Sequence, residues 1–326
     1  MMTAPILDIR HAKVHYPVRR GVLQKATSFV HAVDDVSLSV APGETLGLVG
    51  ESGCGKSTLG RAILGLRGLT DGTIRFRGQS LEGLSPTDEA ALRRDLQLIF
   101  QDPYASLDPR ATIGATIRAG LKIHRIGKAS QQRDRVAQIM RQVGLDPALA
   151  DRYPHEFSGG MRQRVVMARA LVLNPKLVVC DEPTSALDVS VQSQILNLFQ
   201  DLQEQMGLTL LFISHNLAVV EHMADRVAVM YLGRIVEIAE TERLFRAPRH
   251  PYTRALIDAI PVPDPHNRMP PPQLGGDLPS AENLPGGCRF RTRCPLAMAR
   301  CAEAEPDLTG PAAHRTACWL TEGEGT

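Results

Sequence analysis

A glycine-rich stretch near the N-terminus carries the clearest chemical signal of the chain. Gly50-Glu51-Ser52-Gly53-Cys54-Gly55-Lys56-Ser57-Thr58 follows the apolar run Thr45 to Val49 and opens a helical pattern from Lys56 to Leu66. In such an order of strand, loop and helix, backbone N–H groups and the helix N-terminus attract phosphate oxygens. Lys56 is placed to reach the β- and γ-phosphates, and Ser57 to bind Mg²⁺. The spacing predicts a nucleotide-binding loop.

A second signal is a buried strand that ends in two carboxylates. The run Leu177 to Glu182 is apolar up to Cys180 and then gives Asp181 and Glu182, as in a parallel strand covered on both faces. Asp181 is predicted to lie beside the magnesium ion, and Glu182 to polarise an attacking water. The alternative is a solvated acidic pair at a strand end.

A turn of small residues precedes another helical pattern. Ser158, Gly159 and Gly160 open a helix that runs to about Leu173, which makes a second anion-attracting helix terminus. A chain needs one phosphate loop per nucleotide, so the second terminus suggests a nucleotide held by another subunit. The alternative is an ordinary serine N-cap followed by a turn.

In this order the motifs resemble those of the ATP-binding-cassette (ABC) ATPase subunits. That family carries a phosphate loop, a glutamine loop, an S-G-G signature, an acidic strand, a D-loop and a switch histidine. The matching residues are Gly50 to Thr58, Gln101, Ser158 to Gly160, Asp181 with Glu182, Ser185-Ala186-Leu187-Asp188, and His215. The signature differs from the usual form in having Phe157 for leucine and Met161 for glutamine.

The resemblance assigns further roles. Gln101 would contact Mg²⁺ or the water and report to a membrane partner, and His215, after the apolar strand Thr209 to Ser214, would hold the γ-phosphate. Asp188 would join the ATP site through the D-loop. Tyr16 would stack on adenine, although Val18 to His31 reads as an insertion and Phe29 is a nearby competitor.

Composition fits a globular ATPase subunit. The chain has 326 residues, 43% hydrophobic content and a formal charge of +2, so it can bury one large core and a smaller appendage. The balanced charge argues weakly against nucleic acid as a partner. The sequence lacks a signal-peptide pattern and an apolar run of eighteen residues, so any role in transport across a membrane would need membrane-spanning partner chains.

The resemblance implies an α/β fold with a P-loop NTPase core, an N-terminal antiparallel β lobe and a helical signature subdomain. We place the nucleotide-binding domain at residues 1–245, with the helical subdomain at about 102–165. Within it, Ser130 is predicted to cap a helix that ends at Gly144, and Val189 to Met206 to form a helix ended by Gly207.

The composition of the chain changes after about Phe245. Ten of the 23 prolines fall between Arg246 and Pro285, including Pro270-Pro271-Pro272, which excludes a packed helix or a central strand there. We predict a linker at 246–285, with a short, partly docked helix at Pro251 to Leu256. A small Cys-rich C-terminal extension follows at 286–326.

The extension holds four of the six cysteines: Cys288, Cys294, Cys301 and Cys318. Disulfides are disfavoured in the reducing cytosol where cellular ATP is used. The spacings fit neither a compact zinc ribbon nor a ferredoxin run, so a metal site and four unrelated thiols both stay open. The nearby Arg289, Arg291, Arg293 and Arg300 would offset thiolate charge, or are solvated surface residues.

The extension sharpens the resemblance to one subfamily. Pro251-Tyr252-Thr253 and the G-C-R-F-x-x-R-C-P stretch from Gly287 to Pro295 are similar to the C-terminal region of dipeptide and oligopeptide permease ATPases. Some members hold a [4Fe–4S] cluster on a cysteine quartet there. The resemblance therefore implies ATP, Mg²⁺ and a [4Fe–4S] cluster as cofactors, with zinc as the alternative at the quartet.

The function implied is ATP hydrolysis that energises a membrane importer of peptides. A second ABC ATPase subunit, identical or different, would complete each ATP site. Two membrane-spanning permease subunits would be direct partners and a solute-binding protein an indirect one. The chain would sit peripherally on the cytoplasmic face of the cell membrane, without nucleic acid.

Other functions stay open at this stage. The carried solute could be a nickel chelate, glutathione or another small molecule. A soluble cassette ATPase outside transport is less favoured, because the long coiled coils of repair members and the second cassette of translation members are missing. A non-catalytic regulatory cassette is disfavoured by Glu182 and His215.

Overall fold

The computed structural model describes residues 4–20, 25–260 and 278–321. The chain forms two compact units, each assembled from separate stretches of sequence. The first unit comprises Met1–Ile6, Ala41–Thr45 and Glu82–Phe212, and the second comprises Leu7–Val40, Leu46–Leu81 and Ile213–Thr326.

The first unit is built on short buried strands. β6 (Leu96–Ile99) runs parallel to β7 (Leu177–Asp181), with Leu98 opposite Val179, and β8 (Thr209–Ser214) is the next neighbour of β7. The side chains of β7 are buried up to Cys180, and those of β8 along its whole length. Strands buried on both faces read as continuous apolar runs, so both strands lie where the sequence predicts them.

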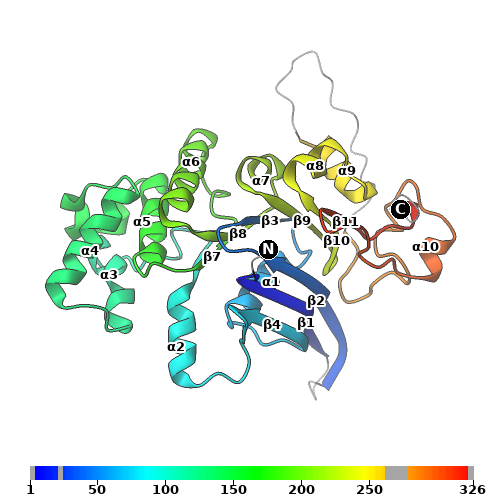
Figure 1. Cartoon of the computed structure of the whole chain (residues 1–326), viewed down its shortest axis with the longest axis horizontal. Helices are drawn as coiled ribbons and strands as arrows, with labels where there is room; N and C mark the ends of the chain where they lie inside the picture. Colours follow the sequence, from blue (N-terminus) through cyan, green and yellow to red (C-terminus); the bar gives the residue numbers. More distant parts are fainter. Residues whose placement is uncertain (1–3, 21–24, 261–277, 322–326) are drawn as a thin grey trace, which may run out of the picture. The chain divides into compact units, whose positions relative to one another are not determined.

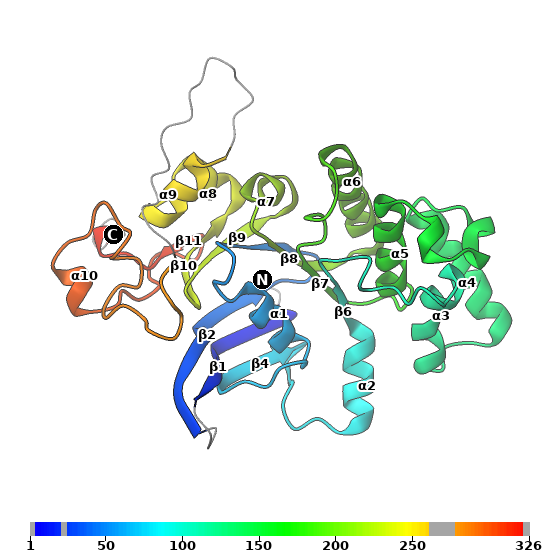
Figure 2. The ribbon, with the colours of Figure 1, turned by 180° about the vertical axis from the view of Figure 1, so that it is seen from behind.

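Helices form the rest of the first unit (Figure 1, Figure 2). α3 packs against both α4 and α5, and α5 also contacts α6. The buried residues of these helices are spaced three or four positions apart, as Val136, Ile139 and Met140 are in α4. The bounds are α2 Pro86–Asp95, α3 Ile113–Ile123, α4 Ala129–Gln142, η1 Pro147–Asp151, η2 Pro154–Glu156, α5 Gly159–Leu171 and α6 Val189–Met206.

Two predicted helix ends have different outcomes. α6 ends at Gly207, which has a φ of +60°, and this confirms the predicted stop because glycine adopts left-handed backbone without strain. The predicted Ser130 cap is wrong. The N-cap of α4 is Lys128, whose backbone N–H donates to Gln131 Oε1 at 2.8 Å. That bond satisfies the cap position two residues earlier, which leaves Ser130 in the first turn.

The second unit contains an antiparallel sheet with the strand order β2-β1-β4-β5. Buried Leu7 and Ile9 alternate with more exposed residues in β1, as expected of a half-covered sheet. The stretch that reads as an insertion extends the β1–β2 hairpin, with Val18 opposite Ser28. The bounds are β1 Leu7–Arg20, β2 Lys25–Val40, β4 Asp71–Phe76 and β5 Gln79–Ser80.

The second unit also contains β3 (Thr45–Val49), β9 (Arg226–Tyr231), β10 (Arg234–Glu240) and β11 (His314–Thr316). They are neighbours in the order β11-β10-β9-β3, with β3 parallel to β9 and the other pairs antiparallel. β11 comes from the C-terminal extension, which therefore contributes a strand to this sheet. The helices are α1 Lys56–Ile63, α7 Leu217–Met223, α8 Thr241–Arg246, α9 Pro251–Asp258, α10 Arg300–Glu303 and η3 Trp319–Thr321.

The described residues directly after α8, up to residue 260, are more tightly packed than a linker. The predicted short helix is α9, and its Tyr252 and Thr253 are fully buried. Glu237 of β10 is also fully buried and accepts the backbone N–H groups of Arg249 and His250. The predicted run Pro270-Pro271-Pro272 lies outside the described residues.

Within the described part of the chain, none of the helices has both the length and the apolar character needed to cross a bilayer.

Candidate functional site

The phosphate loop depends on glycines that hold left-handed backbone. Gly50, Gly53 and Gly55 have φ values of +153°, +82° and +111°. A Cβ on Gly55 would lie 1.9 Å from the carbonyl oxygen of Ala32, and a Cβ on Gly50 would lie 2.2 Å from that of Met230. Both neighbours are backbone atoms that cannot rotate away, so only glycine fits at these two positions.

Lys56 is buried at the centre of this loop. Its Nζ donates to the carbonyl oxygens of Gly50 at 2.7 Å and Glu51 at 2.9 Å. Cys54 Sγ lies 3.7 Å from the same nitrogen, and burial raises the pKa of this thiol. Ser57, the second residue of α1, is half-buried, and Ser52 and Gly53 are exposed. An ammonium and a helix N-terminus thus occupy the loop, as phosphate binding requires.

Two residues that the sequence analysis did not assign to the phosphate loop bind Glu51. Arg293 donates from both terminal nitrogens to the Glu51 carboxylate, at 2.6 and 3.0 Å. Tyr252 accepts the backbone N–H of Glu51 at 2.9 Å. Arg293 is 242 residues from Glu51 along the chain, so local spacing carries no signal for this contact.

An aromatic cluster supports these two residues. Tyr231, Tyr252 and Phe290 pack in tilted and edge-to-face pairs with ring centroids 4.7 to 5.4 Å apart. The geometry is favourable for aromatic rings. β9, α9 and the C-terminal extension each contribute one ring, so the extension packs into the core behind the phosphate loop.

The acidic strand and the glutamine loop meet in the first unit. Gln101 Nε2 donates to Glu182 Oε2 at 3.2 Å. Glu182 directly follows β7 and has a φ of +48°, a backbone conformation that costs a non-glycine residue about 1–3 kcal/mol. The structure therefore brings together two predicted catalytic residues, and one of them is held with backbone strain.

The signature turn packs against the D-loop in the same unit. Ser158 is the N-cap of α5, and its Oγ accepts the N–H of Met161 at 3.4 Å. A Cβ on Gly160 would lie 2.6 Å from Val191, and one on Gly159 would lie 3.4 Å from Leu187. The two glycines thus let the turn approach the start of α6, where Asp188 is the N-cap.

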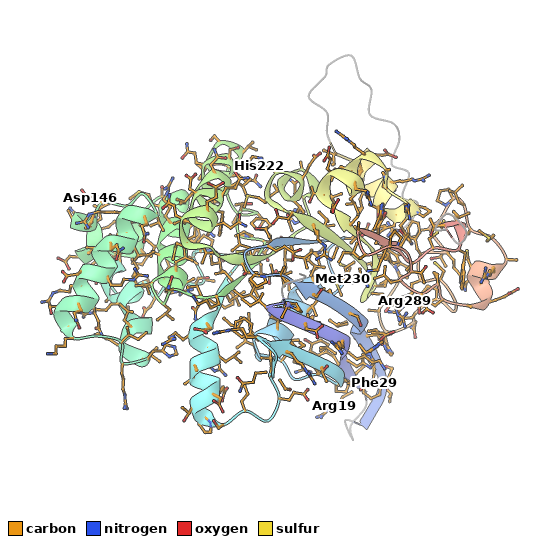
Figure 3. All side chains as sticks on the ribbon, in the orientation of Figure 1. Arg19, Phe29, Asp146, His222, Met230 and Arg289 are labelled. Carbon is orange, nitrogen blue, oxygen red and sulfur yellow. The ribbon has the colours of Figure 1, made fainter. Side chains whose placement is uncertain are left out.

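The remaining predicted residues lie in the second unit. His215 is exposed directly after β8, before Asn216 caps α7. Tyr16 is half-buried on β1, and the Arg67 guanidinium lies 4.2 Å from its ring centroid. Phe29 lies on the β1–β2 hairpin and is 48% exposed (Figure 3). Tyr16 therefore has a planar cation stacked on one face; among the described residues, no such contact is seen for Phe29.

The four cysteines of the extension are also brought together. Cys288, Cys294, Cys301 and Cys318 are free thiols that line one small pocket with Phe290 and Trp319. Burial raises the pKa of Cys288 to about 11 and raises that of Cys294 and Cys318 as well. These thiols must therefore lose protons to bind a metal.

The arginines near the quartet have other partners. Arg289 pairs with Asp34 and Glu305, and Arg293 pairs with Glu51. Arg300 lies over the Trp319 ring. The first two are buried ion-pair residues rather than solvated charges, and their positive charge neutralises carboxylates.

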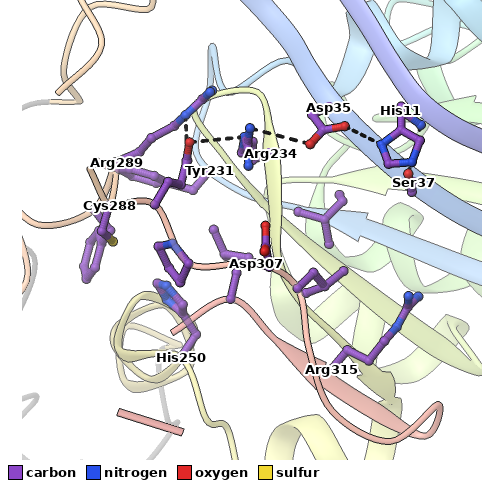
Figure 4. Close-up of a pocket in the computed structure, with 17 residues that line it drawn as sticks. His11, Asp35, Ser37, Tyr231, Arg234, His250, Cys288, Arg289, Asp307 and Arg315 are labelled. Carbon is purple, nitrogen blue, oxygen red and sulfur yellow. Dashed lines mark hydrogen bonds and ion pairs between the residues drawn. The ribbon is translucent and has the colours of Figure 1, made fainter. Parts of the chain in front are cut away.

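A separate pocket of about 230 Å³ lies in the second unit (Figure 4). Its polar lining includes His11, Asp35, Arg234 and Arg315. It contains none of the residues assigned to ATP, so it is distinct from the phosphate loop.

Comparison with known proteins agrees with this geometry. Residues 33–185 match the family described as ABC transporter, and residues 236–301 match the oligopeptide/dipeptide transporter C-terminal region. The chain is 51% identical to the oligopeptide transport ATP-binding protein OppF of Escherichia coli, covering 96% of this chain and 95% of that protein. It is 47% identical to the oligopeptide transport ATP-binding protein AppF of Bacillus subtilis, covering 97% of each.

Solved structures support the same fold. One is cbiO1 of Clostridium perfringens, part of an ABC transporter complex, with a TM-score of 0.64, 26% identity and coverage of 74% of this chain and 91% of that one. Another is a dimeric ATP-binding cassette in a post-hydrolysis state bound to ADP and Pi, with a TM-score of 0.63, 26% identity and coverage of 72% and 98%. The predicted fold class, a P-loop core with an antiparallel β lobe, is confirmed. The chain belongs to the ABC transporter ATPases, in the subfamily that carries the oligopeptide/dipeptide transporter C-terminal region.

Proposed function

We propose that this chain is the ATP-hydrolysing subunit of a peptide importer. Two relatives at about 50% identity over nearly the whole chain are named as oligopeptide transport ATP-binding proteins. The region that distinguishes this subfamily contacts the phosphate loop through Tyr252 of α9 and Arg293 of the C-terminal extension. Hydrolysis of ATP to ADP and phosphate is the energy source for transport.

The observation that carries the proposal is the contact between Gln101 and Glu182. A carboxylate at a strand end, oriented by an amide, can polarise a water for attack on the γ-phosphate, since phosphoryl transfer needs mainly positioning and electrostatics. Asp181 and Ser57 are proposed to bind the Mg²⁺ ion, which neutralises charge on the phosphates. His215 is proposed to hold the γ-phosphate, and Tyr16 the adenine.

The proposed catalytic form is a head-to-tail pair of ATPase subunits. The signature residues Ser158 to Gly160 of one subunit would bind the γ-phosphate held by Lys56 of the other. Val189, next to the D-loop, is 79% exposed, so its side chain is accessible to a partner subunit. ATP contacts both subunits only in the closed pair, so it shifts the population toward closure and hydrolysis reverses the shift.

The permease is proposed to bind beside Gln101. Phe100 and Tyr104 flank this residue and are 43% and 59% exposed. Aromatic side chains supply much of the binding energy at protein interfaces. Two permease subunits would therefore place this chain peripherally on the cytoplasmic face of the membrane, with the solute-binding protein as an indirect partner.

The catalytic proposal is tested with Glu182→Gln in the assembled transporter. We expect ATP hydrolysis to fall at least about 100-fold while ATP binding is retained, because the amide cannot accept a proton from water. Glu240→Gln is the matched control, since Glu240 also ends a strand and is exposed. Undiminished hydrolysis by Glu182→Gln would remove Glu182 from its role and would favour a different base.

The transported solute needs a separate experiment. Vesicles containing the complete transporter should accumulate labelled oligopeptides in an ATP-dependent way, and Lys56→Ala should abolish this uptake. Uptake of a nickel chelate or glutathione in place of peptides would assign the chain to another importer of the subfamily. ATPase activity without any permease partner would support the less favoured function outside transport.

The cysteine quartet is proposed to hold a [4Fe–4S] cluster, with zinc as the alternative. Four thiols line one pocket, which is the donor set that such clusters use. A tetrahedral Zn–S site would hold its sulfurs about 3.8 Å apart, from a bond length of about 2.3 Å. Among the described residues, no three of these thiols have their sulfurs within 4.8 Å of one another, and this wider spacing suits a cluster better than one ion. A cluster there would stabilise the fold of the extension.

Anaerobic purification distinguishes the two metals. We expect a brown protein with about four iron atoms per chain, lost in Cys288→Ser and Cys301→Ser. Cys54→Ser is the matched control, because Cys54 is buried in the phosphate loop and does not line the pocket of the quartet. A colourless protein with one zinc per chain would establish the alternative.

A further inference from the structure

Two imidazoles and a carboxylate converge on the β1–β2 hairpin, apart from the cysteine quartet. His15 Nε2 lies 3.1 Å from Asp34 Oδ1 and 3.2 Å from His31 Nδ1. His31 Nδ1 lies 3.9 Å from Asp34 Oδ2. In the described part of the chain, this is the one group of three such ligand atoms that lie within 4.8 Å of one another.

The spacing matches the edges of a small coordination polyhedron. A tetrahedral zinc ion with bonds of about 2.05 Å to nitrogen and oxygen holds its ligand atoms about 3.3 Å apart. His15 Nε2 lies 3.1 Å from Asp34 Oδ1 and 3.2 Å from His31 Nδ1, both close to that value, and one ligand atom from each of the three residues lies within 4.8 Å of the others. The ligand atoms are therefore already at binding distance, and little rearrangement is needed for an ion to enter.

Hydrogen bonding alone satisfies this group poorly. His15 Nε2 faces both an acceptor oxygen and the second imidazole nitrogen. In a neutral ring this nitrogen carries either one proton or one lone pair, so without a cation it either shares one N–H between Asp34 and His31 or leaves Asp34 Oδ1 without this donor. A cation at the centre would use a lone pair from every member of the group.

The surroundings allow a cation. Arg289 donates to the other Asp34 oxygen and also pairs with Glu305 at 2.9 Å. Arg234 lies between Asp35 and Glu305, at 3.6 and 3.4 Å. Three carboxylates thus face two guanidinium groups, which leaves one negative charge. The His31 side chain is 33% exposed, which gives an ion access from solvent and leaves room for a water as the fourth ligand.

We propose that His15, His31 and Asp34 form a binding site for a divalent transition-metal ion of the zinc class. Imidazole nitrogens and a single carboxylate oxygen suit zinc, whereas calcium and magnesium need oxygen ligands. The ion ties β1 to β2 beside Tyr16. It also fixes the segment around Ala32, whose carbonyl oxygen lies against Gly55 of the phosphate loop. The site is structural, since none of its ligands belongs to the proposed ATPase machinery.

The first test measures binding of Co²⁺, a spectroscopic substitute for zinc, to the full chain. We expect visible d–d absorption from a site with nitrogen and oxygen ligands, saturating at one ion per chain and lost in His15→Gln and His31→Asn. Absorption from the cysteine quartet, whether from a cluster or from thiolate-bound cobalt, should be unchanged in both variants. These substitutions keep the side chains polar and remove only the imidazoles.

His11→Gln is the matched control. His11 also lies on β1 and pairs with a β2 carboxylate, Asp35, at 2.7 Å (Figure 4), but among the described residues it belongs to no group of three candidate metal ligands. We expect this variant to bind Co²⁺ like the unmodified chain. Equal loss of the visible bands in His11→Gln, or equal bands in all four proteins, would overturn the proposal.

A second test needs no variant, so it does not depend on how the variants fold. Diethyl pyrocarbonate modifies free imidazole nitrogens, and mass spectrometry locates the product on each peptide. With one equivalent of Zn²⁺ we expect modification of His15 and His31 to fall at least fivefold, while His11 is unaffected. With Mg²⁺ we expect no protection. Unchanged modification of His15 and His31 in zinc would refute the site.

Discussion

Arg293 of the C-terminal extension forms a two-point ion pair with Glu51 of the phosphate loop, at 2.6 and 3.0 Å. The Arg293 side chain is 5% exposed and that of Glu51 is 28% exposed. The hydrogen bond with Glu51 raises the pKa of Arg293, so the guanidinium stays charged at neutral pH. The extension is thereby fastened to the nucleotide-binding loop.

We expect Arg293→Ala to weaken both folding and nucleotide binding. Loss of the guanidinium leaves a partly buried carboxylate without its partner, which should cost about 2 kcal/mol of unfolding free energy after allowance for the exposure of Glu51. ATP affinity should fall several-fold, as measured by titration calorimetry. Arg246→Ala is the control, because Arg246 pairs with Glu242 on an exposed helix surface. Similar losses in both variants would mean that the buried pair has no special role.

Gly55→Ala should weaken ATP binding at least about 100-fold. The added Cβ would collide with the Ala32 carbonyl oxygen at 1.9 Å while φ is +111°, and together these should cost at least about 3 kcal/mol. That corresponds to an affinity loss of about 100-fold, which nucleotide fluorescence would detect. Gly53→Ala is the comparison variant, because Gly53 also has a positive φ but a Cβ there would lie 4.0 Å from its nearest atom. It should lose much less affinity, and equal losses would contradict the steric explanation.

Val189→Asp tests the ATPase pair. A charge placed on this exposed apolar position should weaken the ATP-bound dimer at least about tenfold, or about 1.4 kcal/mol. The measurement is size-exclusion chromatography in the Glu182→Gln background, which blocks hydrolysis. Ile123→Asp is the control, since Ile123 is 75% exposed and ends α3, away from the D-loop in the sequence. A dimer that tolerates Val189→Asp would place the interface elsewhere.

His250 should make stability depend on pH. Burial lowers its pKa to about 4, whereas the unfolded value is about 6.5. Between these values the unfolded chain binds more protons, so stability is fully present above about pH 6.5 and is lost as the pH falls toward 4. The total loss of unfolding free energy is roughly 3 kcal/mol, at about 1.36 kcal/mol per pKa unit.

His250→Asn provides the comparison for this titration. The asparagine oxygen can replace Nδ1, which accepts the Tyr252 N–H at 3.0 Å, but it does not titrate. We expect urea unfolding of this variant to depend less steeply on pH between 6.5 and 4. An identical slope in both proteins would mean that other groups, such as Glu237, dominate the pH dependence.

The order of short motifs in the sequence was enough to predict much of the fold of this protein. Phosphate loops, helix caps and buried strands are local features, because a few consecutive residues set the backbone angles and the apolar periodicity. Lys56, Asp181, Glu182 and the strands that precede them are therefore readable from spacing alone. The helix at Val189–Met206, with Gly207 as its stop, is of the same kind. The roles of single site residues and the domain boundaries stay predictions.

Tertiary structure alone decided which distant residues meet. The partners of Glu51 are 242 and 201 residues away along the chain, and no periodicity specifies such a pair. The composition of residues 246–285 suggests a linker, yet Tyr252 within it is buried because β9 and the extension supply rings for it to pack against. His15, His31 and Asp34 likewise read as unrelated residues until the register of β1 and β2 brings them together. Burial and cross-strand pairing depend on the whole fold, and a local sequence pattern does not contain them.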